Sequence, residues 1–356
     1  MKLLKYLFFL LLIVVIGGAV YFGTKDGNFD VSETKTINAP ASMIYSNVND
    51  FKNWREWGPW MDEDPDLQIM YPDSTAGVGG YYNWTSEVMG DGSMKTVGAE
   101  KDKSLDQEIV FNTPLGESKS DVYWRFVPAE DGTEVTWGMK GEQSFMEKVF
   151  SAFMKEDFKV NIKKMYGQGL TNLDETIKKE MEKYTITVEG IKEHGGGFYM
   201  YTTAASTQAD IGNKMGPMLG KVLGFMQQNK IGQAGMPFTI YNEWDDENGS
   251  VIFSTAIPIS ERVIVTEGDV LCGYMAPTSA VKTVLLGNYT NLKEVYEKAH
   301  EYVAQNNLLM DPARKPFEVY ANDPGNIPNP AEWRTEVYIP VFKDLRSNHP
   351  IISGNN

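Results

Sequence analysis

Cysteine is almost absent from this chain, and histidine is rare. The one cysteine, Cys272, cannot form an intrachain disulfide or a cysteine metal cluster. The three histidines, His194, His300 and His349, are too far apart for the usual zinc spacings. Alternate acids within residues 62–66 hint at a calcium loop, but the glycine and glutamate that such a loop needs are missing. The sequence therefore predicts no metal and no cofactor.

Basic residues are in the minority, and no basic patch interrupts the sequence. The chain has 33 Lys and Arg against 48 Asp and Glu, a net charge of −15 at neutral pH, and its pI is about 4.8. Proteins that bind the phosphate backbone of nucleic acids need clustered Lys and Arg. We therefore expect no nucleic-acid partner.

The longest apolar segment is at the amino end, where residues 6–22 contain no charge. At ~1.5 Å per helical residue it approaches the ~30 Å hydrocarbon core of a bilayer. Lys2 and Lys5 precede it, which places the amino end in the cytoplasm and the remainder outside. A cleaved signal peptide is the alternative, although the run lacks the small residues spaced Ala-x-Ala that usually end one. We expect residues 1–24 to be a signal anchor, with the soluble domains on the extracytoplasmic side of the membrane.

Residues 30–180 predict a strand, a short helix, a series of antiparallel strands and a long closing helix. Strands are expected at 31–37, 94–99, 106–111, 120–128 and 133–140. The closing helix is expected over 146–183, with a kink or break at Gly167 or Gly169. Three tryptophans and a phenylalanine within residues 51–60 carry too much apolar area for solvent, and they should plug the end of the sheet.

This order of elements describes a helix-grip fold. With Ile-Asn-Ala-Pro at 37–40 and Asp-Phe-x-x-Trp-x-x-Trp at 50–57, the segment is similar to the START-like (SRPBCC) superfamily and its polyketide cyclase/dehydratase-type branch. Members of that family hold apolar ligands between the sheet and the long helix, and few of them share catalytic residues. The resemblance therefore implies a ligand cavity and not a cyclase.

A pattern of strand, helix and hairpin occurs twice in the second half of the chain. Pro-Phe-x-x-Tyr begins at Pro237 and again at Pro316, and a strand that ends in Ile-Pro follows each copy. Apolar residues with helical spacing precede each copy, at 215–226 and 292–303. Two such units predict one antiparallel sheet with both helices on one face and a cleft where the halves meet.

The closing strand, residues 335–341, carries a single acid. Alternation sends its threonine and aliphatic residues to one face of the sheet, and Glu336 and Tyr338 to the other. When the two copies are aligned on Ile-Pro, Glu336 falls opposite Ser254, so only the second copy has the acid. Such an acid lies either on a solvated sheet surface or at the floor of a pocket, and its presence in one copy alone favours a site.

Residues 184–342 resemble the GyrI-like (AraC-type effector-binding) small-molecule-binding domain. The motifs are the two Pro-Phe-x-x-Tyr hairpins, Gly-x-Tyr-x-x-Leu at 287–292, Tyr-x-Asn-Asp-Pro at 320–324 and the closing Thr-Glu-Val-Tyr-Ile-Pro-Val. In that family the glutamate of the closing strand lies in an aromatic-lined cleft and helps to hold organic, often cationic, ligands. The resemblance implies that Glu336 has this role. The candidate walls of the cleft are Tyr338, Tyr241, Tyr320 and Trp333.

The apolar amino-terminal run and the two resemblances together predict an α+β protein that is anchored in a membrane and binds hydrophobic or cationic organic ligands, as a non-enzymatic sensor or carrier. Two alternatives stay open: a small-molecule hydrolase with Glu336 as general acid or base, and an envelope interaction protein with vestigial clefts. A hydrolase needs a second polar group close to Glu336, for which Glu243, Glu318 and Glu332 are candidates. Residues 343–356 are expected to form a polar tail.

Overall fold

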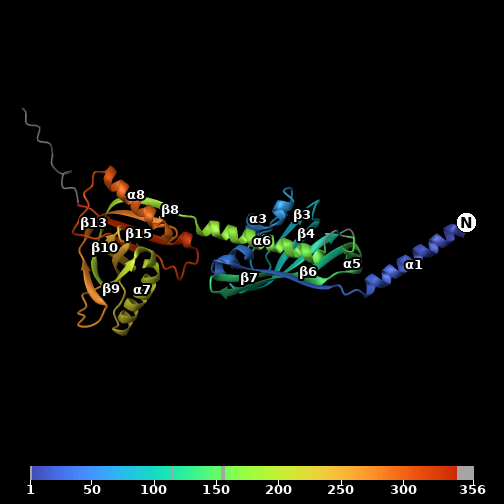
Figure 1. Cartoon of the computed structure of the whole chain (residues 1–356), viewed down its shortest axis with the longest axis horizontal. Helices are drawn as coiled ribbons and strands as arrows, with labels where there is room; N and C mark the ends of the chain where they lie inside the picture. Colours follow the sequence, from blue (N-terminus) through green and yellow to red (C-terminus); the bar gives the residue numbers. More distant parts are fainter. Residues whose placement is uncertain (1, 114–115, 154–156, 343–356) are drawn as a thin grey trace, which may run out of the picture. The chain divides into compact units, whose positions relative to one another are not determined.

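A computed structural model of the protein describes residues 2–113, 116–153 and 157–342 (Figure 1). The chain divides into two compact units, Met1–Glu180 and Met181–Asn356. Each unit combines one antiparallel sheet with helices, so the predicted α+β class is confirmed.

The amino-terminal helix α1 extends over Lys2–Thr24. Its segment Leu4–Thr24 is long and apolar enough to cross a membrane, and none of it is buried against the rest of the protein. A signal sequence near the amino end has the same properties. The predicted polar tail, residues 343–356, lies outside the described residues.

Seven strands form the sheet of the first unit, in the order β1-β7-β6-β5-β4-β3-β2. Their bounds are β1 Asn28–Ile37, β2 Gln68–Met70, β3 Tyr81–Thr85, β4 Asp91–Glu100, β5 Ser104–Thr113, β6 Gly116–Ala129 and β7 Gly132–Glu142. Between β1 and β2 lie α2 Ala41–Asn49, α3 Trp54–Trp57 and α4 Trp60–Glu63. Since β1 pairs with β7, the first strand joins the sheet beside the last.

The closing helix expected over 146–183 is two helices, α5 Phe145–Ser151 and α6 Phe158–Met181. The break lies between α5 and α6, at a place that the sequence did not predict. The start of α6 is set by Asp157, whose carboxylate accepts a hydrogen bond of 2.8 Å from the backbone N–H of Lys159. This local capping bond defines a helix start that the pattern of apolar residues does not reveal.

The expected break at Gly167 or Gly169 is wrong, because α6 runs unbroken through both residues. A Cβ at Gly169 would lie 2.6 Å from the ring of Trp137, so the glycine lets the helix approach the sheet closely. One turn earlier on α6, Tyr166 stacks on the same ring with 3.9 Å between the centroids. The glycine thus serves packing between helix and sheet.

The tryptophans of α3 are buried, as the sequence predicted. Trp54 and Trp57 pack against Trp124 of β6 and Trp137 of β7, with ring centroids between 5.8 and 6.0 Å apart. The indole of Trp54 donates a hydrogen bond of 2.8 Å to the carbonyl oxygen of Val48. Trp124 and Trp137 stack on each other on neighbouring strands. This aromatic cluster forms a large part of the first core.

Eight strands form the sheet of the second unit, in the order β12-β9-β11-β10-β14-β15-β13-β8. Their bounds are β8 Thr185–His194, β9 Gly197–Thr207, β10 Phe238–Asp245, β11 Ser250–Ile259, β12 Leu271–Met275, β13 Thr278–Leu286, β14 Phe317–Tyr320 and β15 Arg334–Pro340. The helices are α7 Ile211–Gln228 and α8 Leu292–Gln305. The two copies of the repeat exchange their first strands, since β8 pairs with β13 and β12 with β9. The predicted duplication is confirmed in this interlocked form.

Both helices of the second unit cover the same face of the sheet (Figure 1). Met200 and Ile257 pack with Val222 of α7, and Val281 with Ala299 of α8. The strand register places these residues on one face across the whole sheet. The buried centre of the sheet therefore lies between and beneath the two helices.

Leu173 of α6 is completely buried, so replacing it by alanine should leave a cavity in the first core. We expect Leu173→Ala to lower the free energy of unfolding of the first unit by about 2–5 kcal/mol. The measurement is urea unfolding followed by tryptophan fluorescence, because every tryptophan except Trp244 and Trp333 lies in this unit. Val127→Ala, at an exposed position of β6, should change the value by less than ~0.5 kcal/mol. Equal losses in the two variants would contradict this account of the core.

Candidate functional site

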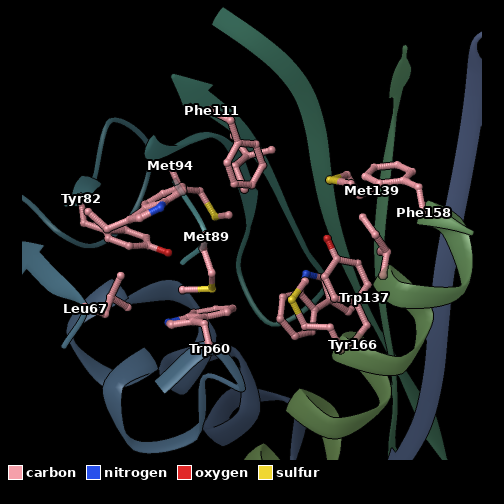
Figure 2. Close-up of a pocket in the computed structure, with 14 residues that line it drawn as sticks. Trp60, Leu67, Tyr82, Met89, Met94, Phe111, Trp137, Met139, Phe158 and Tyr166 are labelled. Atoms are coloured by element: carbon pink, nitrogen blue, oxygen red, sulfur yellow. The ribbon is translucent and has the colours of Figure 1, made fainter. Parts of the chain in front are cut away.

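An apolar cavity of about 140 Å³ lies in the first unit (Figure 2). Its lining comes from α4, from strands β3, β4, β5 and β7, from the first half of α6, and from the loop residues Leu67 and Met89. Figure 2 shows Met89 and Met94 on one side of the space, with Trp137 and Tyr166 on the other. A dry cavity of roughly 150 Å³ accepts a benzene-sized molecule, so this space fits a small apolar group or part of a larger ligand.

Polar groups are few in this cavity. Burial raises the pKa of the hydroxyls of Tyr82 and Tyr166, which keeps both phenols neutral. The indole N–H of Trp137, another lining residue, has no hydrogen-bond partner among the described residues. The cavity therefore offers mainly apolar contact.

The residues predicted to bind ligand in the second unit lie on two opposite faces of the sheet. In the pairing of β14 with β15, Glu318 is opposite Val337 and Val319 is opposite Glu336. Val337 packs against α8, so Glu318 lies on the face that the helices cover. Glu336 therefore lies on the other face.

The aromatic candidates divide in the same way. Tyr241 and Tyr320 accompany Glu318 on the helix-covered face. Trp333 lies near these two tyrosines. The ring of Tyr289 contacts the ring of Trp333, with 4.9 Å between centroids, and also the ring of Tyr320, with 5.7 Å. Tyr338 lies with Glu336 on the opposite face, stacked on Phe317 at 4.8 Å. The five predicted residues are thus not brought together at one site.

Glu336 is compensated by cations of the protein itself. Its carboxylate lies 2.9 Å from the ammonium of Lys282 and 2.8 Å from the guanidinium of Arg334. The hydroxyl of Tyr338 donates a further bond of 2.8 Å. Burial by itself would raise the pKa of Glu336, but these hydrogen bonds outweigh burial and hold the pKa below its usual value. An ionised, paired carboxylate is poorly suited to act as a general acid or to attract a ligand cation.

The second acid near Glu336 is none of the candidates named from the sequence. It is Glu189 of β8, which lies 3.6 Å from the ammonium of Lys282. Glu318 is on the other face, and Glu243 and Glu332 are exposed side chains. The polar groups around Glu336 therefore form a network of ion pairs.

Glu318 is the buried acid of the second unit. The hydroxyls of Tyr296 and Tyr320 each donate a hydrogen bond of 3.1 Å to its carboxylate, and Tyr241 donates a third. Burial nevertheless raises the pKa of Glu318 to about 7, because desolvation outweighs the three phenol donors. Within the described part of the chain the carboxylate has no ion-pair partner. The protein thus keeps a titratable acid beneath α8, among aromatic rings.

The sequence analysis named Glu318 only as a possible partner of Glu336, yet the repeat contains a stronger indication. When the two Pro-Phe-x-x-Tyr motifs are aligned, Glu318 falls opposite Thr239. As with Glu336 and Ser254, only the second copy of the repeat has an acid at this position. Glu318 also stands between Phe317 and Val319 in a short strand, where alternation places it on the face opposite to theirs. Only knowledge of which face the helices cover shows that this face is the buried one.

Residues 28–178 match the family model described as polyketide cyclase/dehydrase and lipid transport. This segment is similar to that family. The match covers β1 to α6, and the cavity lies between the sheet and α6 of this cyclase-type domain. The START-like resemblance stated from the sequence is therefore confirmed, and a fold that binds small ligands is shown.

Several solved structures are similar to the chain. The C-terminal domain of EcmrR is 23% identical and covers 45% of this chain and 98% of that chain, with a TM-score of 0.37. EcmrR in a complex with DNA is 16% identical, and the match covers 61% of this chain and 88% of EcmrR, with a TM-score of 0.39. Protein MLL2253 from Mesorhizobium loti is 15% identical, and the match covers 42% of this chain and 98% of MLL2253, with a TM-score of 0.32. At these values the similarities say nothing about ligand or activity. No curated protein matches the chain.

No group of three or more His, Cys, Asp or Glu side chains within the described ranges is placed to hold a metal ion. The cyclase-type domain offers a cavity lined by aromatic, aliphatic and methionine side chains. The second unit offers one buried acid among tyrosines. The cavity is suited to binding small organic molecules.

The two carboxylates of the second unit should have opposite effects on stability as pH changes. From pH 4.5 to about 7 folded Glu318 keeps a proton that the unfolded chain has lost. Stability from this group is therefore full below pH 4.5 and falls as pH rises through 7, by roughly 3 kcal/mol. We expect Glu318→Gln to remove this fall, so that calorimetry at pH 8 shows a higher melting temperature than for the wild-type chain.

Glu336→Gln is the matched control on the other face. The pKa of Glu336 is lowered, so its stabilisation is present above its ordinary value of 4.5 and is lost as pH falls through the folded value. This variant should melt lower than wild type at pH 7 and approach it under acid conditions. A Glu318→Gln chain that keeps the full wild-type dependence between pH 5 and 8 would show that Glu318 titrates normally.

Proposed function

We propose that the protein is a membrane-anchored, non-enzymatic binder of small organic ligands. The observation that carries the proposal is the apolar cavity of the cyclase-type domain, lined by rings, methionines and aliphatic side chains. Apolar spaces with few polar groups favour binding over chemistry, because they hold no activated nucleophile or acid–base pair.

The anchor in this proposal is α1, held in the membrane by residues 6–22. Its apolar length and its exposure support an uncleaved anchor, and Lys2 and Lys5 place the two domains on the extracytoplasmic side. A chain with a net charge of −15 is repelled by phosphate backbones, so we propose no nucleic-acid partner.

The second domain contributes a second binding place, centred on Glu318. A buried carboxylate without a cation of its own is stabilised by an organic cation, and tyrosine faces add cation–π contacts of roughly 0.5–2 kcal/mol each. Such a ligand would lower the pKa of Glu318 and remove the cost of its ionisation. Glu336, with Tyr338, was the acid expected from the family resemblance, but its pairing with Lys282 and Arg334 leaves it less suited to this role.

A small-molecule hydrolase is the second candidate function, and the pKa of Glu318 is the observation that favours it. An acid with a pKa of about 7 can take and return a proton at neutral pH, and tyrosine hydroxyls stand 3.1 Å away. Hydrolysis of activated esters that is lost in Glu318→Gln and kept in Glu336→Gln would establish this alternative over simple binding.

Filling the cavity should abolish binding of neutral lipophiles. Ile109 of β5 lines the cavity, and Ile109→Trp would occupy much of its ~140 Å³. We expect the affinity for toluene-sized aromatic compounds to fall at least tenfold, measured by titration calorimetry on the full chain in detergent. Val110→Trp, at the next position on the same strand and outside the lining, should bind as wild type does. Equal affinity in Ile109→Trp and wild type would remove the cavity from the proposal.

Binding of a hydrophobic cation should depend on Glu318 and not on Glu336. With tetraphenylphosphonium as the probe, we expect Glu318→Gln to lose about tenfold in affinity, because the buried charge that attracts the cation is gone. Glu336→Gln should lose less than twofold. The reverse ranking would restore the closing-strand glutamate as the binding residue.

A further inference from the structure

Helix α5 turns its apolar side chains away from the first unit. Phe145, Met146 and Phe150 are 42%, 45% and 70% exposed, and Phe153 in the following turn is 81% exposed. At ~100° per residue these positions and Val149 share one face of the helix. A surface helix of a soluble domain normally places such a face against the core.

The polar side chains of α5 point the other way, towards the protein. Glu147 accepts a hydrogen bond from Ser118 of β6 and also closes the capping box with Ser144 at the start of the helix. Lys148 is buried, and Ser151 accepts a bond of 3.0 Å from Gln143. Because specific bonds fix the polar face, the outward direction of the apolar face is built into the fold.

This helix lies directly beside the end of α1. The ammonium of Lys148 donates a hydrogen bond of 2.8 Å to the carbonyl oxygen of Lys25, the residue that follows α1. The backbone N–H of Gln143 donates one of 2.9 Å to Gly27, and Asn28 then pairs with Glu142 as β1 begins. The short segment that leaves α1 is thus tied along its length to the segment that carries α5.

We propose that the exposed face of α5, formed by Phe145, Met146, Val149, Phe150 and Phe153, inserts into the interface of the lipid bilayer that holds α1. The inference rests on the proposed anchoring by α1. If α1 spans a membrane, Lys25 lies where the chain leaves it, and the bond from Lys148 holds α5 at the same level. Within α5 insertion desolvates no charge, since Glu147 and Lys148 point away from this face. Short amphipathic segments with phenylalanine bind bilayers at the boundary of headgroups and acyl chains.

The bilayer is the occupant that best fits this surface. It is present wherever α1 is inserted, so the apolar face is covered without any further association. A helix-tethered face also needs little affinity of its own, because the anchor keeps its local concentration at the membrane high. A protein partner or a second copy of the chain would have to compete with that tether.

The same end of the domain holds one end of the ligand cavity. Phe158 lines the cavity, and its ring contacts that of Phe29 with 5.2 Å between the centroids. Phe29 follows Asn28, where the segment from α1 enters β1. Docking of α5 therefore brings the Phe158 end of the cavity close to the acyl chains, a source of apolar ligands.

The test uses the full chain with Cys272→Ser in phosphatidylcholine vesicles. An environment-sensitive nitrobenzoxadiazole label is attached to Phe150→Cys, Phe153→Cys or Val127→Cys. Val127 is 52% exposed and pairs with Glu134 at the opposite end of the sheet. We expect nitroxide-labelled lipid to quench the labels at 150 and 153 at least threefold more than the label at 127, and aqueous iodide to quench them at least threefold less.

Equal iodide access and equal lipid quenching at positions 150 and 127 would overturn the proposal. Protection from iodide without quenching by lipid would also overturn it, and would indicate a protein partner or a second copy. A label at Ile13→Cys in α1 reports the anchor separately. If it escapes nitroxides placed deep in the acyl chain while positions 150 and 153 are quenched, anchoring by α1 fails and docking of α5 stands.

Discussion

A β-strand sends successive side chains to opposite faces of its sheet, and in the second unit this alternation decides the fate of two carboxylates. Glu318 and Glu336 lie on paired strands, displaced from one another by one position of the register. Because both helices cover one face, Glu318 is buried among tyrosines and becomes hard to ionise. Glu336 reaches the face that carries Lys282 and Arg334 and becomes easy to ionise. One step along the strand separates a candidate binding group from a structural ion pair.

The same arrangement of a sheet covered on one face produces the cavity of the cyclase-type domain. Large rings of α3, β6 and β7 fill the space beside α6, and Gly169 lets the helix approach them. Towards the start of α6 the side chains do not close completely, and about 140 Å³ is left among apolar groups. Dense packing in one region therefore keeps the helix at a fixed distance while a ligand space persists in another.

Helix α5 is an exception, because its apolar side chains are exposed instead of packed against the sheet. Folding normally removes apolar area from water, so a helix that directs phenylalanines outwards must gain its stability elsewhere. In α5 that gain comes from a capping box and from bonds to Ser118, Gln143 and Lys25. The final environment of the exposed face is then set by what lies outside the domain.

Much of the architecture follows from the sequence alone. Apolar length identified α1, strand alternation and turns identified the first sheet, and the repeated Pro-Phe-x-x-Tyr motif identified the duplicated second sheet. These features depend on neighbours along the chain, which the sequence contains. The exchange of first strands between the two copies and the burial of Glu318 instead of Glu336 depend on contacts between distant segments. Only the tertiary structure decides them, because a strand pattern fixes which residues share a face but not which face the helices will cover.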